Sequence, residues 1–205
     1  MRSAEGHIVN TSSINGFWGC LGPGAAQTAY CAAKFAVKGF REALVVDLRL
    51  NAPHVKVSVA MPGHIRTDLV TNSGSVLGKA EPLEMSAADV ATLQRRMSQQ
   101  GVAVEEMTDA EIRAAANQRA LDFYAEAPLT AAEAAAIILE GVRAQRWRIL
   151  VGEDAVFLDR LVRAHPEEAY EESFADRIAE AGELRVLLQY TRGQTSGPPA
   201  TRRRD

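Results

Sequence analysis

The sequence has no long apolar run, few cysteines and no excess of positive charge. No stretch of its 205 residues approaches the roughly 20 apolar residues that a membrane helix needs. The first residues also lack the apolar stretch of a signal peptide. A net charge of -3 disfavours nucleic acid or an anionic membrane as a partner. We therefore expect a cytoplasmic protein that acts on a small molecule or binds another protein.

The cysteines and the overall composition restrict the choice further. Cys20 and Cys31 have neither a CxxC pair nor the Cys/His spacing of a zinc site, so we expect reduced thiols and no metal site. With 47% hydrophobic and 24% charged residues, the chain is typical of one globular domain. We assign residues 1–190 to this domain. Residues 191–205, rich in Gly, Pro and Arg, are predicted to be a disordered tail.

The first part of the chain predicts a strand, a helix and a second strand. Residues 7–13 have a β-branched, apolar core and a polar end, which is typical of a parallel strand buried on both faces. Apolar residues at helical spacing predict a helix over 28–50, and residues 55–61 predict a strand that Pro62 and Gly63 end. This order indicates two parallel strands with a helical crossover. Because a buried strand needs neighbours on both edges, we expect a segment upstream of residue 7 to be missing.

The rest of the chain predicts an excursion from the sheet and then a return to it. Residues 67–128 are polar and are predicted to be rich in loops, followed by an apolar helix through Val142 and a strand over 147–152. Further helical segments are predicted at 157–164 and 170–188. Capping-box patterns mark three helix starts, at Ser86-x-x-Asp89, Thr108-x-x-Glu111 and Thr130-x-x-Glu133.

A tyrosine and a lysine near the start of the first helix are candidates for acid/base chemistry. Tyr30 and Lys34 lie one turn apart on the same helix face, and the preceding strand ends at Ser13, where parallel sheets bind ligands. A phenol is a weak base at neutral pH unless a nearby cation favours its charged form. Ser13 could then hold a substrate oxygen while Tyr30 exchanges a proton with it. The alternative is an exposed helical pair without a function.

Three segments together resemble consecutive motifs of the short-chain dehydrogenase/reductase family. They are Ile8-Val9-Asn10-Thr11-Ser12-Ser13-Ile14-Asn15-Gly16, Ala29-Tyr30-Cys31-Ala32-Ala33-Lys34-Phe35-Ala36-Val37 and Met61-Pro62-Gly63-His64-Ile65-Arg66-Thr67. The resemblance implies an α/β fold, namely the C-terminal portion of a doubly wound parallel sheet (Rossmann-type domain) with a helical substrate lid over about 68–128. It also implies an NAD(P)-dependent oxidoreductase that interconverts an alcohol and a ketone.

The resemblance also implies a role for each motif residue. Tyr30 would be the catalytic acid/base, Lys34 would favour its ionised form and bind the nicotinamide ribose, and Ser13 would orient the substrate oxygen. The cofactor would be NAD or NADP, and the sequence leaves open which of the two. Residues expected to hold the nicotinamide are Tyr30, Lys34, Pro62, Gly63, Ile65 and Thr67.

Two departures from the family pattern matter. The seventeen residues from Ser13 to Tyr30 exceed the commonest family spacing, so the segment is either an extended rim of the substrate pocket or a harmless insertion. Candidates for this pocket are Asn15, Phe17 and Trp18, with Tyr124 considered as well, although such aromatic residues more often pack in a core.

The second departure is that the family's Gly-rich phosphate loop and ribose selector would lie upstream of residue 7. We therefore expect a truncated chain that is inactive as this fragment alone. The alternative is a non-catalytic remnant that associates with related subunits. In either case the helix over 28–50 is the expected interface of a homo-oligomer. His64 is expected to be a solvated turn residue more than a cofactor contact, and the other histidines are expected at the surface or at strand ends.

Overall fold

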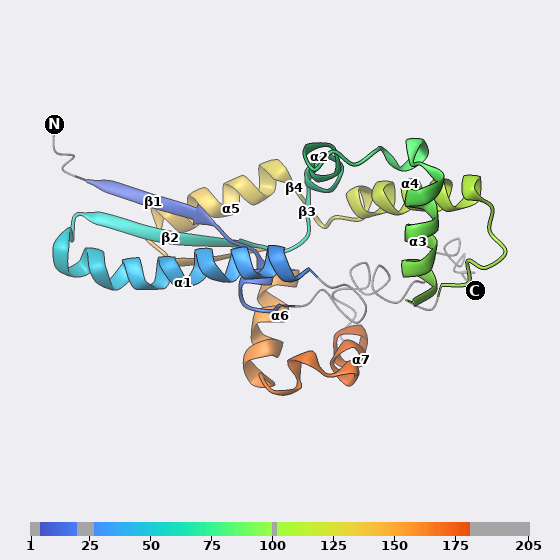
Figure 1. Ribbon diagram of the computed structural model, residues 1–205. Helices are drawn as coiled ribbons and strands as arrows, with labels where there is room; N and C mark the ends of the chain where they lie inside the picture. Colours follow the sequence, from blue (N-terminus) through green and yellow to red (C-terminus); the bar gives the residue numbers. More distant parts are fainter. Residues whose placement is uncertain (1–4, 20–26, 100–101, 181–205) are drawn as a thin grey trace, which may run out of the picture.

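The computed structural model describes residues 5–19, 27–99 and 102–180. In these ranges it contains a parallel sheet flanked by helices, as the sequence predicts (Figure 1). The elements, in chain order, are β1 (Gly6–Thr11), η1 (Ile14–Gly16), α1 (Thr28–Asn51), β2 (Val55–Pro62), β3 (Ile65–Arg66), α2 (Leu69–Val76), η2 (Pro82–Glu84), α3 (Ala87–Gln99), α4 (Asp109–Ala125), β4 (Leu129–Thr130), α5 (Ala131–Arg143), β5 (Arg148–Val151), α6 (Glu153–Ala164), η3 (Glu168–Tyr170) and α7 (Glu172–Glu180).

The main sheet has the order β1-β2-β5, and both pairs are parallel. β2 is its central strand and is buried from Val57 to Met61. β1 differs from the expectation of a strand buried on both faces, since Ile8 and Val9 are 41% and 39% exposed. The reason is that β1 has one strand neighbour, β2, within the described part of the chain.

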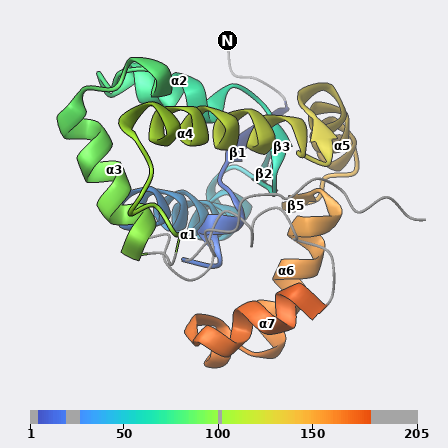
Figure 2. The same ribbon diagram turned by 90° about the vertical axis from the view of Figure 1, so that its right-hand side faces the viewer.

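The first helix and the fifth lie on opposite sides of this sheet (Figures 1 and 2). α1 packs against β1 and β2, and α5 packs against β2 and β5. The helix predicted over 28–50 is confirmed, and it ends where Ala52 N donates to Leu48 O at 2.9 Å. The parallel crossover from β1 through α1 to β2 is therefore confirmed as well.

Residues 67–128 form an excursion from the sheet, and the helices predicted to start at Ser86 and Thr108 are confirmed as α3 and α4. The segment contains less loop than the sequence predicts, because α2 and η2 are helical as well. α2, α3 and α4 lie together beyond the end of the sheet (Figure 2). α3 and α4 share a small core of their own, made of Val90, Met97, Val104 and Ile112. Their polar sequence reflects how few residues this small core needs, because short helical pairs leave most side chains in water.

A two-stranded parallel ladder ties this helical excursion to the sheet. β3 pairs with β4 through Ile65↔Leu129 and Arg66↔Thr130. The sequence did not predict this ladder, since two residues are too few to show a strand periodicity.

The C-terminal helices pack around the segment that follows β1. α6 begins at Glu153, four residues before the predicted helical segment. The helix predicted over 170–188 is confirmed in the described part as α7, which the short helix η3 precedes. Residues 181–190, the predicted tail 191–205 and Cys20 lie outside the described residues. Among the described residues, the structure contains no helix that is both long and apolar enough to cross a membrane.

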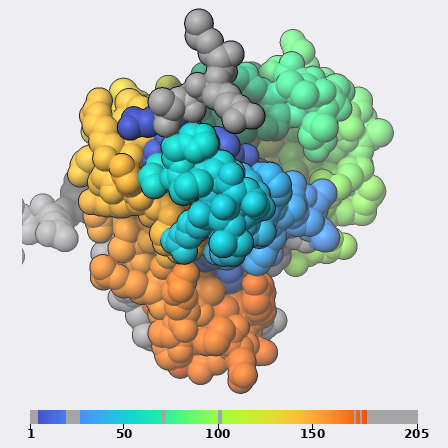
Figure 3. Space-filling model, turned by 90° about the vertical axis from the view of Figure 1, so that its left-hand side faces the viewer, coloured from blue at the N-terminus to red at the C-terminus, as the bar shows by residue number. Residues whose placement is uncertain are grey.

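One face of the molecule shows the connection from α1 to β2 in cyan, with α5 in yellow and α6 and α7 in orange beside it (Figure 3). A cleft of about 280 Å³ lies between the last turns of α1, the start of β2 and the loop before β5. This is the edge of the sheet where the parallel strands β1 and β2 begin. Ser13 and Tyr30 come after the end of β1, at the opposite edge. The cleft is therefore separate from the residues that the sequence singles out.

Candidate functional site

The tyrosine and the lysine of α1 meet at the carboxyl end of β1. Lys34 Nζ lies 5.5 Å from the centroid of the Tyr30 ring. The same ammonium donates a hydrogen bond to Thr11 O, the last residue of β1, at 3.4 Å. The side chain of Tyr30 is exposed to solvent. The lysine thus connects the phenol to the end of the strand that leads to Ser13.

Ser13 begins the short helix η1, which lies directly against α1. Its Oγ accepts a hydrogen bond from Asn15 N at 3.2 Å, and the hydroxyl has only a long contact of 3.5 Å to Asn15 Oδ1. Ser12 Oγ donates to Lys34 O at 2.8 Å. A Cβ on Gly16 would collide with Ser12 and with the Lys34 backbone, so a glycine permits this close approach. The elements that carry Ser13, Tyr30 and Lys34 are therefore in direct contact.

The segment predicted to hold the nicotinamide follows the neighbouring strand. β1 and β2 are in register up to Thr11↔Ala60, so the chain that leaves β2 emerges at the same sheet edge as Ser13. Pro62 ends β2, and Gly63 N donates to Val151 O at 3.0 Å. Ile65 is half-buried in β3, and Thr67 is exposed directly after it.

His64 is buried, so the expectation of a solvated turn histidine is wrong. The residue is 5% exposed, and its Nε2–H donates to Phe123 O at 2.7 Å. Its ring lies 4.0 Å, centroid to centroid, from the ring of Phe123. Burial lowers the pKa of His64, and the hydrogen bond to Phe123 opposes this shift. The sequence could not show this, because the partner is 59 residues away.

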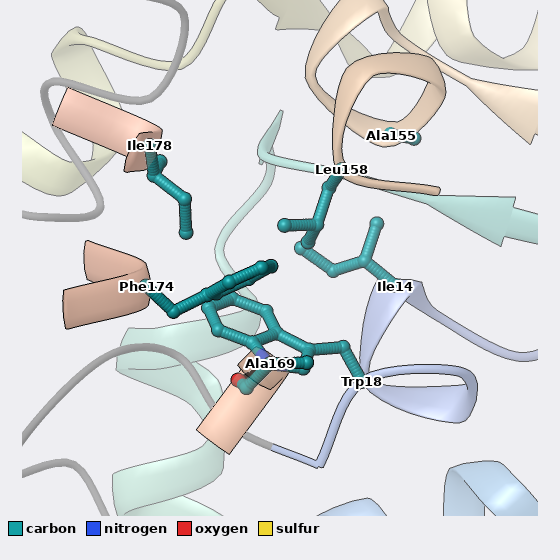
Figure 4. Packing of buried hydrophobic residues seen from close by; sticks show 7 residues of the cluster. All are labelled: Ile14, Trp18, Ala155, Leu158, Ala169, Phe174 and Ile178. Atoms are coloured by element: carbon teal, nitrogen blue, oxygen red, sulfur yellow. Dashed lines mark hydrogen bonds between the residues drawn. The ribbon is translucent and has the colours of Figure 1, made fainter. Parts of the chain in front are cut away.

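Of the three pocket candidates, Trp18 packs into a core instead. Its Nε1 donates to Ala169 O at 2.8 Å, and its ring lies 5.9 Å from that of Phe174 (Figure 4). Phe17 is half-buried, with the Arg148 guanidinium carbon 5.8 Å from its ring centroid. Asn15 is buried and donates to Trp18 O at 3.4 Å. Residues 14–19 thus provide an attachment for the C-terminal helices.

The remaining chemistry-bearing side chains do not form a metal site in the described residues. No group of three or more His, Cys, Asp or Glu side chains is arranged to hold a metal ion in residues 5–19, 27–99 and 102–180. Cys31 is buried and forms no disulfide within the described residues, and Asn15 Nδ2 lies 3.7 Å from its sulfur. His7 is half-buried near the start of β1, where its Nε2 lies 2.7 Å from Ser58 Oγ.

Comparisons with known proteins agree with this arrangement. The family model described as short chain dehydrogenase matches residues 1–77. Nodulation protein G of Azospirillum brasilense is 45% identical over 65 residues, which is 32% of this chain and 24% of that protein. The 3-ketodihydrosphingosine reductase of Bacteroides thetaiotaomicron is 41% identical over 73 residues, 35% of this chain and 25% of the reductase.

A solved structure extends the likeness beyond the matched sequence. A short chain dehydrogenase/reductase from Burkholderia phymatum, in complex with NAD, superimposes with a TM-score of 0.51 at 22% identity, covering 78% of this chain and 48% of that one. The chain therefore has an α/β fold of the Rossmann type. It spans about a quarter of the length of the curated relatives that it matches. The resemblance seen in the sequence is confirmed over residues 1–77, and this span contains every residue expected to act in catalysis or cofactor binding.

Proposed function

We propose that this protein is an oxidoreductase that transfers hydride between NAD or NADP and an alcohol/ketone substrate. The observation that carries the proposal is the position of Lys34 Nζ, which faces the Tyr30 ring and also binds the last carbonyl of β1. This position puts a cation beside a phenol at the sheet edge where ligands of parallel sheets bind. The match of residues 1–77 to the short chain dehydrogenase model supports it.

The acid/base steps belong to three side chains of this chain. The hydroxyl of Ser13 is held by Asn15 through a long contact and can turn to a substrate oxygen. Tyr30 gives a proton to this oxygen during ketone reduction and takes one from it during alcohol oxidation. The positive charge of Lys34 stabilises the phenolate that forms in the first of these two steps.

The available hydrogen-bond donors fit a nicotinamide cofactor. An ammonium has three donors, and Lys34 uses one of them on Thr11 O, which leaves donors for a ribose hydroxyl. The hydroxyl of Thr67 is exposed beside the turn that Pro62 and Gly63 form, and together with the backbone of Ile65 it would hold the carboxamide. The cofactor, when bound, supplies or accepts the hydride.

A conservative substitution of the tyrosine tests this function. In the protein expressed from its natural gene, we expect Tyr30→Phe to reduce turnover of secondary alcohols at least about 100-fold, because general acid/base catalysis contributes about that much. Cofactor binding should remain nearly intact. Tyr170→Phe is the matched control, since that phenol accepts a hydrogen bond from Gly19 N and has no proposed role in proton transfer. Turnover above about a tenth of wild type in Tyr30→Phe would remove this residue from its role.

Association through α1 is the second candidate function, as a homo-oligomer or as a non-catalytic subunit. One observation favours it: α1 exposes large apolar side chains, namely Phe35, Phe40, Val46 and Leu50. Such a surface is typical of an interface. We expect Phe40→Asp to lower the mass measured by sedimentation equilibrium, whereas Glu42→Gln on the same helix should leave it unchanged. A wild-type protein that sediments as a monomer at every concentration would exclude the interface.

A further inference from the structure

A carboxylate from α6 lies buried against the turn that follows β2. Asp154 is 4% exposed, and its Oδ2 accepts a hydrogen bond from His64 N at 2.6 Å. Its Oδ1 accepts from Ala155 N at 2.9 Å. The two residues that the first bond joins are 90 positions apart. The carboxylate thus connects the start of α6 to the turn proposed to face the nicotinamide.

Two glycines keep open the space that this carboxylate fills. A Cβ on Gly63 or on Gly152 would collide with the Asp154 side chain. Gly152 also has φ of 107°, a backbone conformation that favours glycine. Burial raises the pKa of Asp154, and the hydrogen bonds from His64 N and Ala155 N oppose this shift. The site is therefore shaped for a carboxylate that accepts two backbone N–H groups.

The same turn holds the end of α4 on its other side. Besides the bond from His64 to Phe123 O, Arg66 Nη2 donates to Ala125 O at 3.1 Å and to Ala127 O at 3.4 Å. Carbonyls at the C-terminal end of a helix lack donors within the helix, and a nearby cation stabilises them. Residues 62–66 are consequently fixed to α6 by one hydrogen bond, to α4 by two, and to Ala127 just after α4 by a third.

We propose that Asp154 is a positioning residue that fixes the 62–67 turn for the nicotinamide and, through His64, sets the place of α4 over the site. This inference rests on the proposed function. Asp154 contacts neither the substrate nor the reacting atoms; it acts by holding His64 N. A turn that is held in this way presents the backbone of Ile65 and the hydroxyl of Thr67 without a further ordering cost when the cofactor binds.

Asp154→Asn tests the proposal with almost no change in shape. An amide has one oxygen, and its NH₂ group would face one of the two N–H donors, so only one of them can be accepted. We expect amide hydrogen exchange in residues 62–67 and 118–128 to become about tenfold faster, and the Kd for NAD or NADP to rise about tenfold with a much smaller change in kcat. The protein expressed from its natural gene is used throughout.

Two further variants separate the local effect from general destabilisation. Asp159→Asn is the matched control on the same helix, because Asp159 is also buried but pairs with Arg148 and Arg163. It should lower the urea midpoint without faster exchange at the turn. His64→Gln keeps the N–H that Asp154 accepts and removes the ring, so exchange should increase at the end of α4 and not at Gly63.

The outcomes are distinct. Unchanged exchange at residues 62–67 in Asp154→Asn overturns the proposal, as does faster exchange with an unchanged cofactor Kd, which would leave Asp154 a purely structural role. Similar exchange profiles for Asp154→Asn and Asp159→Asn would also overturn it. If wild-type protein binds neither NAD nor NADP by calorimetry, the proposed function fails, and the exchange data still decide whether Asp154 holds the turn.

Discussion

Arg41 carries a charge that the described part of the structure leaves without a partner, and replacing it should stabilise the protein. The residue lies in the middle of α1 and is 1% exposed. Its Nε, Nη1 and Nη2 atoms are buried and have no hydrogen-bond partner among the described residues. Burial lowers the pKa of the guanidinium, which means that the surroundings disfavour its charged form. We expect Arg41→Met to relieve this cost, because methionine fills a similar length with apolar atoms.

The size of the gain follows from the desolvation of the unpaired group. A buried polar group left without a partner costs about 1–3 kcal/mol, and more when it is charged. Replacing buried charged groups by apolar residues of similar volume is often stabilising by about 1–4 kcal/mol. We take about 2 kcal/mol for Arg41→Met, since the flexible arginine stem lets the guanidinium approach water during fluctuations. For a chain of this size that corresponds to a rise in Tm of roughly 4–8 °C.

Urea unfolding followed by circular dichroism measures this gain, with Arg49→Met as the control. Arg49 is exposed in the last turn of the same helix, so its replacement should change the free energy of unfolding by no more than about 0.5 kcal/mol. A second readout is His7, whose pKa is lowered by burial and also by the charge of Arg41. Its pKa should rise in Arg41→Met. A loss of about 1 kcal/mol or more, or an unchanged His7 pKa, would refute the reasoning, because the guanidinium would then have an anionic partner.

Four more predictions follow from contacts described above. Lys34→Ala should weaken cofactor binding and turnover together in titration and rate assays, and Lys34→Arg should not restore them, because a planar fork does not replace a compact ammonium. Burial lowers the pKa of His64 in the folded protein. Below the ordinary histidine pKa of about 6.5, the unfolded chain therefore binds more protons than the folded one. Stability should therefore fall as pH drops from about 7 to 5, and His64→Asn should flatten this slope in urea midpoints. Burial of Asp159 is outweighed by Arg148 and a second arginine, so its pKa is lowered. Its stabilisation is present above about pH 4 and lost as pH falls further, and Asp159→Asn should remove this acid dependence. Gly63→Ala should cost about 1–3 kcal/mol by thermal unfolding, since the new Cβ would meet the Asp154 carboxylate.

The parts of the fold that the sequence predicts are those with local signals. The capping boxes that begin at Thr108 and Thr130 form as expected, with side chain and backbone bonded reciprocally over three residues. The order of β1, α1 and β2 follows from changes in apolar periodicity and from the turn at Pro62. The roles of Ser13, Tyr30 and Lys34 stay predictions, although the structure brings the elements that carry them into contact.

The features that the sequence does not predict all depend on partners far along the chain. Trp18 is held by Ala169, 151 residues away, and nothing in the segment around Trp18 distinguishes a core residue from the rim of a pocket. The same holds for His64, whose neighbours Pro62 and Gly63 indicate a turn but not the helix that buries it. A local pattern reports the backbone shape of its own segment, whereas burial is decided by whichever distant element packs over it.

This difference accounts for the way the candidate site is built. Ser13, proposed to hold the substrate oxygen, and Tyr30, proposed to exchange a proton with it, lie in the strand–helix unit where motifs are dense and the family model matches. The contacts that fix the turn of residues 62–67 come from α4 and α6, outside that match. A motif constrains residue type at a given spacing, but a carboxylate such as Asp154 can be supplied by any element that reaches the turn. The sequence can therefore propose which residues act at the site, and the groups proposed to position them become visible only once the chain is folded.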